Sequence, residues 1–228
     1  MRIRSFIIAY ALVLAILLFA DRRPGSTQPA RYSHVVDLTD GQTIMPAQAK
    51  AQPTESRTRI IAPAALIPGT WTAGQIPAER LIAPLVVMDL NPVPEGSPQI
   101  SLDDIAAWES HHGVIPQGAV VAIRRSGAHD DLTTNDRLTP SFPIARDAAE
   151  FLIDARYTIG FAVETPVDFA SDRTLAWQLA LHGSYVVEGA ARFTALPATG
   201  SLVIVAPAKR TIKKPGEAAP VRILAMVR

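Results

Sequence analysis

Hydrophobic residues recur along the chain in short, β-branched runs that end at prolines, glycines or charged residues. Runs of this kind predict strands, and several are apolar at successive positions, as in strands that are covered on both faces. The predicted strands span residues 34–38, 59–63, 84–90, 119–124, 158–163, 184–188, 201–207 and 221–227.

Three segments between these runs have helical periodicity instead: residues 101–113, 146–156 and 171–183. The first begins with a capping box formed by Ser101 and Asp104. In the third, Leu175, Leu179 and His182 are predicted to share one stripe. Strands and helices alternate irregularly, which indicates a mixed α/β fold.

The N-terminus carries a different pattern. Two arginines precede an uncharged run in residues 1–20, so we expect an export signal or a membrane anchor. The run's 15 residues would span only roughly 22 Å as a helix, which favours a cleaved signal. The absence of a clear small-residue cleavage motif favours an uncleaved anchor. A buried helix of the domain is a third alternative.

Residues 21–32 are rich in Pro, Gly, Ser and Thr, and are predicted to link this segment to one domain at residues 33–228. Two arginines and the amino terminus precede the apolar run, whereas Asp21 offsets Arg22 and Arg23 after it. This small excess of positive charge before the run is expected to place the domain outside the cytoplasm, on the periplasmic side of a bacterial membrane. Cleavage would instead release it as a soluble periplasmic or secreted protein.

Composition excludes several classes of function. The net charge is +1 and the basic residues are scattered, so no nucleic-acid partner is expected. The chain has 0 cysteines, which excludes thiol chemistry and Cys-based zinc sites. Only His, Asp and Glu side chains remain as ligands for a metal.

Several segments, taken in order, carry a family resemblance: VVDLTDGQTI, IPAERLIAPLVVMDL, DDIAAWESHHGVIPQGAVVAIRRSG, DAAEFLIDARYTIGFAVET and VVEGAARFTALPATGSLVIVAPAK. The chain resembles the cyclase family, which includes bacterial kynurenine formamidases and other metal-dependent amide and ester hydrolases. The resemblance implies a mixed-sheet, barrel-like domain with flanking helices, and a tendency to self-associate.

The metal-binding motif of that family, H-x-G-T-H-x-D-x-x-x-H, is degenerate in this chain. Its central Gly-Thr pair is retained, but the metal-ligand positions fall on Ile67, Trp71 and Ala73, and the final His position falls on Pro77. None of these side chains binds a metal, so we expect neither a metal nor another cofactor.

The resemblance also implies a His twelve residues before a Glu. Glu188 matches that Glu, whereas Ala176 stands at the His position, so five of six functional positions are replaced. His182 is only six residues from Glu188 and is not assigned to the missing role. Without a metal, either the pocket stays wet, or Glu188 is neutral or paired, with Arg192 the nearest basic residue in sequence. We expect Ile67, Trp71 and Pro77 to fill the former pocket, which favours a neutral or paired Glu188 over a wet pocket.

Other residues leave alternatives open. Trp71 is either core filling or a stacking platform for an aromatic ligand. His129, beside two aspartates, could bind a cation weakly. His111 and His112 end a predicted helix, where they fit its C-terminal dipole better than a metal.

Three functions follow. The first is a membrane-tethered, catalytically degenerate protein that acts as a binding or structural subunit, with a protein partner or with copies of itself. The alternative is a metal-dependent amide hydrolase whose active site is rebuilt around Glu188, His182 or His129. The third is a sensor of a small aromatic or carboxylate ligand.

Overall fold

The computed structural model describes residues 32–40, 57–90, 99–125, 142–209 and 218–228. The predicted signal or anchor at residues 1–20, residues 21–31 of the predicted linker, and His129 lie outside these ranges. Residues Tyr32–Arg228 form one compact unit. Among the described residues, no helix is both long and apolar enough to cross a membrane.

The strand prediction is confirmed, with shifts of one or two residues at half of the strand ends. The strands are β1 (His34–Asp37), β2 (Arg59–Ile61), β3 (Ile82–Leu90), β4 (Val120–Arg125), β5 (Gly160–Val163), β6 (Tyr185–Glu188), β7 (Ser201–Pro207) and β8 (Ala219–Val227). The main helices are α3 (Leu102–His112), α4 (Arg146–Arg156) and α5 (Arg173–Leu181). Short helical turns are α2 (Pro63–Leu66), η2 (Ala73–Gln75), η3 (Ala78–Arg80) and η4 (Phe193–Ala195).

The sheet closes on itself. Its order is β1-β8-β2-β6-β5-β4-β3-β7, and β7 also pairs with β8, so seven of the described strands form a barrel that β1 extends at β8. Strands β3 to β6 run parallel, whereas β2, β7 and β8 pair in antiparallel register. This is the mixed-sheet, barrel-like fold with flanking helices that the resemblance implied.

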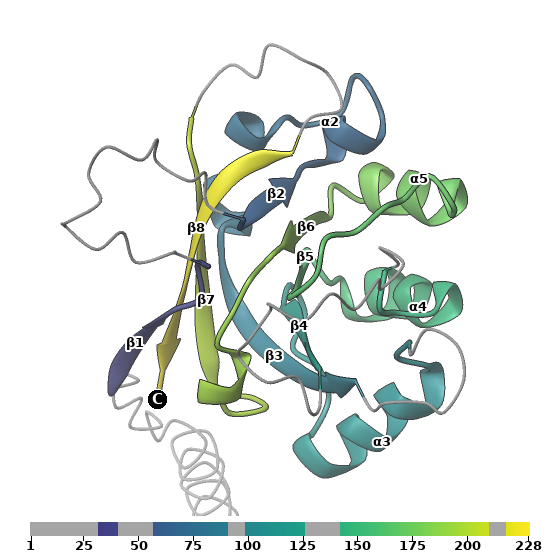
Figure 1. The fold of residues 1–228 in the computed structure, drawn as a ribbon. Coiled ribbons are helices and arrows are strands. Elements are labelled where there is room, and N and C mark those ends of the chain that lie inside the picture. Colours follow the sequence, from purple (N-terminus) through teal and green to yellow (C-terminus); the bar gives the residue numbers. More distant parts are fainter. Residues whose placement is uncertain (1–31, 41–56, 91–98, 126–141, 210–217) are drawn as a thin grey trace, which may run out of the picture. The chain divides into compact units, whose positions relative to one another are not determined.

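Alternation along the strands separates two hydrophobic cores. In β3, Leu85 and Val87 belong to the core inside the barrel, whereas Val86 and Met88 belong to the core beneath the helices. Figure 1 shows α3, α4 and α5 on one side of strands β3 to β6. Because both faces of these strands are covered, their sequences are apolar at successive positions.

The helices form where the pattern predicts them. The capping box is present at the start of α3, with the Ser101 hydroxyl accepting from the Asp104 amide at 3.2 Å. Leu175 and Leu179 are buried as predicted. The prediction for His182 is wrong: it caps the exposed end of α5, with Nδ1 3.0 Å from the Gln178 carbonyl and Nε2 3.2 Å from Asp154.

Candidate functional site

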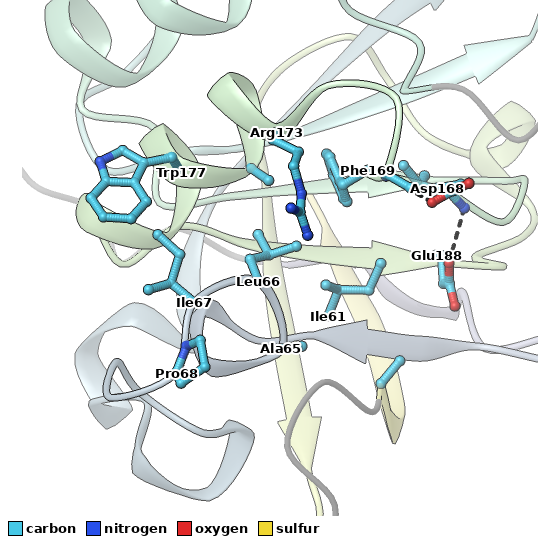
Figure 2. A pocket seen from close by; sticks show the side chains of 14 residues that line it. Ile61, Ala65, Leu66, Ile67, Pro68, Asp168, Phe169, Arg173, Trp177 and Glu188 are labelled. Atoms are coloured by element: carbon cyan, nitrogen blue, oxygen red, sulfur yellow. Dashed lines mark hydrogen bonds between the residues drawn. The ribbon is translucent and has the colours of Figure 1, made fainter.

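An open pocket of about 600 Å³ lies where α2 and β2 approach the start of α5 and the end of β6 (Figure 2). Its wall combines apolar side chains, including Ile61, Leu66, Ile67 and Phe169, with the charged side chains of Asp168, Arg173 and Glu188. The expectation of a filled pocket is therefore wrong. Only one of the three residues predicted to fill it, Ile67, is among the residues that line it.

Glu188 lies at the end of β6 and is half-buried at the side of this pocket. Its Oε2 accepts a hydrogen bond from the Val167 backbone amide at 3.0 Å. Arg59 is its register partner on β2, and the Arg59 guanidinium donates to the Ala218 carbonyl at 2.7 Å. The predicted pairing with Arg192 is not seen: Arg192 is exposed at the N-cap of η4, and the hydrogen bond of Glu188 is to Val167.

The turn after β6 fixes the position of Glu188. Gly189 has a φ of +64°, and the Arg57 carbonyl oxygen lies 2.5 Å from the place that a Cβ would occupy. The Thr58 hydroxyl also donates to the Gly189 carbonyl at 2.7 Å. A glycine is required here because any side chain would meet backbone atoms.

A cation enters the pocket from α5. Arg173 is the first residue of that helix, and Figure 2 shows its guanidinium directed between Leu66 and Phe169. Its neighbour Asp172 caps the helix, accepting from the Leu175 amide at 3.0 Å, and pairs with Arg146 at 3.0 Å. Partial burial opposes ionisation of Asp172, but these hydrogen bonds outweigh burial and lower its pKa.

The structure separates the residues at the degenerate motif. Ile67 and Ala176 lie together with Glu188 at the pocket. Ala73 is 2% exposed and lies in the barrel core, and Pro77 is the N-cap of η3. Neither is among the residues that line the pocket.

Trp71 also lies away from the pocket and is neither core filling nor a stacking platform within it. Its side chain is 39% exposed and packs against the end of α5, with a ring carbon 2.7 Å from the ideal Cβ position of Gly183. The Arg80 guanidinium lies 5.6 Å from the centre of its ring. Trp71 therefore joins the segment after α2 to the C-terminal end of α5.

The residues present do not fit the divalent metal that the resemblance implies. Ile67, Trp71 and Ala73 carry no atom that would ligate such an ion. Throughout the described part of the chain, no group of three or more His, Asp or Glu residues is arranged to hold a metal. The His111 Nδ1–H donates a hydrogen bond to the Ala107 carbonyl at 2.7 Å, consistent with its predicted place at a helix end.

Comparison with known proteins assigns the chain to a family. Residues 24–167 match the sequence model of the Cyclase family, described as "Putative cyclase". The chain belongs to the cyclase family. The barrel fold agrees with this assignment, because solved structures with a similar fold include a potential metal-dependent hydrolase with cyclase activity. No curated protein matches the chain.

Two solved cyclase-like structures share about a quarter of their residues with the chain. Isatin hydrolase A from Labrenzia aggregata, bound to benzyl benzoate, is 26% identical with a TM-score of 0.59, and the match covers 85% of this chain and 93% of that one. A potential metal-dependent hydrolase with cyclase activity is 25% identical with a TM-score of 0.59, covering 86% and 98%. Isatin hydrolase A from Ralstonia solanacearum, at 21% identity, a TM-score of 0.62 and coverage of 96% and 97%, shows the shared fold alone.

The sequence pattern did not point to the other residues with polar atoms in the pocket. Arg173, Ala176 and Trp177 stand at positions i, i+3 and i+4 of α5 and line the pocket together. Since Ala176 was already assigned to the former site, helical spacing alone could have identified Arg173 and Trp177. Asp168 and Phe169 precede α5 in an irregular segment, where no periodicity indicates which side chains face the pocket.

Proposed function

We propose that this cyclase-family protein no longer performs metal-dependent hydrolysis and acts as a binding or structural subunit of a membrane-associated complex. The apolar segment at residues 1–20 tethers it, and the domain lies on the periplasmic side. If the segment is cleaved, the domain is soluble in the same compartment.

One observation carries the proposal. The pocket contains Glu188, but its lining also includes Ile67 and Ala176, at positions where the family resemblance implies histidines. An alkyl side chain neither ligates a metal nor transfers a proton. Among the described residues that line this pocket, none is a histidine.

Exposed apolar side chains support a role in binding. Trp177 and Leu181 are four residues apart on α5 and are 55% and 59% exposed. Residues at this spacing lie on one face of a helix, so together they offer an apolar surface. A second copy of the chain or a different protein would be the partner of such a surface.

A second candidate function is an amide hydrolase with a rebuilt site. It is favoured by the position of Glu188 at the pocket and by the relatives described as hydrolases. Glu188 would have to act as the general base without a neighbouring histidine in the lining.

Hydrolysis assays separate the two functions. We expect the full chain, purified in mild detergent and supplied with zinc or manganese, to leave N-formylkynurenine and isatin intact. Turnover that Glu188→Ala abolishes would overturn the proposal and favour the rebuilt hydrolase. Size measurements on the same preparation, with co-purification from detergent extracts, would distinguish self-association from a different protein partner.

A further inference from the structure

We propose that the pocket binds a small organic acid, with its carboxylate on Arg173, its apolar body between Leu66 and Phe169, and an N–H donor directed at Glu188. The inference rests on the proposed function, because it assigns the pocket to binding rather than to metal-dependent hydrolysis.

The positive charge of the pocket comes from Arg173. Among the described residues, no carboxylate lies within ion-pairing distance of the Arg173 guanidinium. The adjacent Asp172 pairs with Arg146 instead, at 3.0 Å. A guanidinium presents parallel N–H groups that match the two oxygens of a carboxylate. Where a metal would have supplied the positive charge, this chain supplies it from the first turn of α5.

The surroundings of Arg173 favour a ligand with an apolar body. Figure 2 shows the guanidinium between the side chains of Leu66 and Phe169, above Ile61. Arg173 itself is exposed, so these apolar side chains contact the body of the ligand while the ion pair keeps contact with water. The pocket volume of about 600 Å³ is within the range of small-molecule sites.

The opposite side of the pocket selects a hydrogen-bond donor. Glu188 Oε2 accepts from the Val167 amide, and no hydrogen bond to Oε1 is present among the described residues. Asp168 adds a second carboxylate to the same side. An anionic group would be repelled there, whereas an amine or amide N–H would be accepted, so the two sides orient the ligand.

Calorimetric titration of the full chain in mild detergent with 4-aminobenzoate tests this inference, with EDTA present throughout. This probe carries a carboxylate and an amine at opposite ends of one ring. We expect saturable binding of one molecule per chain. Benzoate should bind more weakly because it lacks the donor, and aniline should bind more weakly because it lacks the carboxylate.

Variants assign the contacts. Arg173→Gln should weaken binding of 4-aminobenzoate about 2-fold to 5-fold, the range for an ion pair at an exposed arginine. Arg173→Lys should fall between the parent and Arg173→Gln, because it keeps the charge and loses the paired donors. Arg222→Gln, at an exposed arginine on β8, is the matched control and should bind like the parent.

A fourth variant tests the side of the pocket that accepts the ligand's N–H donor. Glu188→Gln should weaken binding of 4-aminobenzoate more than binding of benzoate.

The outcomes also separate this inference from the proposed function. Absence of binding, or equal binding by Arg173→Gln and Arg222→Gln, would overturn the inference, while the hydrolysis assays would still decide the proposed function. Binding that appears only when EDTA is replaced by zinc would show that a metal holds the carboxylate. That result would overturn both.

Discussion

Replacing Gly183 with alanine tests whether Trp71 has become a packing residue. Gly183 follows α5 with a φ of +66°, and a Cβ at this position would lie 2.7 Å from one carbon of the Trp71 ring and 3.1 Å from another. Carbon atoms do not approach this closely, so either the ring or the end of α5 must move.

The cost has two parts. The left-handed backbone conformation penalises alanine by about 1–2 kcal/mol, and forcing a methyl group into a packed contact costs about 1–3 kcal/mol more. We therefore expect Gly183→Ala to lower the free energy of unfolding by about 2–5 kcal/mol. The upper part of this range applies if the Trp71 ring stays in place. Because Trp71 is 39% exposed, the ring can also swing outward, which costs its contact with Arg80 and gives a smaller loss of stability.

Urea unfolding followed by far-UV circular dichroism measures this cost. Gly118 is the matched control, because its φ is +73° and nothing lies within 4 Å of its Cβ position. Gly118→Ala should lose only the backbone part, and so should Gly183→Ala in a Trp71→Ala background. Equal losses for Gly183→Ala and Gly118→Ala, with no relief in the double variant, would refute the assignment of Trp71 to packing.

Two other contacts give measurable predictions. Hydrogen bonds from Arg156 at 2.6 and 2.8 Å lower the pKa of Glu109, so Glu109→Gln should destabilise the chain at neutral pH by about 1.5–3 kcal/mol. This ion pair stabilises the fold fully above the ordinary glutamate pKa of about 4.3. In urea unfolding, the difference in stability between Glu109→Gln and the parent should vanish as the pH falls through the lower folded pKa of Glu109. A stability difference that does not change with pH would contradict the assignment. Glu188→Ala removes the acceptor of the Val167 amide, so hydrogen exchange of that amide should accelerate, and unchanged exchange would contradict the contact.

The fold was predictable because the apolar runs of the strands and the helical periodicity are both strong in the sequence. The runs at residues 84–90 and 119–124 alternate between two cores, and the helix over residues 146–156 has one apolar face that the structure buries. Closure of the barrel was implied only by the family resemblance. Pairing of β7 with both β3 and β8 depends on contacts between distant segments, which local patterns do not encode.

The pocket was less predictable because each substitution was judged by size alone. Trp71 stands at a position where the family resemblance implies a metal ligand, so a large side chain there was expected to fill the pocket. The structure instead directs Trp71 to Gly183, whose positive φ and missing side chain make room for the ring. Arg173 was not predicted, because the resemblance assigned it no role. The direction of its side chain also depends on where α5 begins, which the sequence pattern does not fix to the residue.

The metal content of the full chain, measured after exposure to zinc and manganese and removal of loosely bound ions, tests the central claim most directly. The account predicts a ratio near zero per chain, unchanged by Glu188→Ala. A ratio near one that falls in Glu188→Ala would contradict it and show that the pocket has kept a metal through a rebuilt set of ligands.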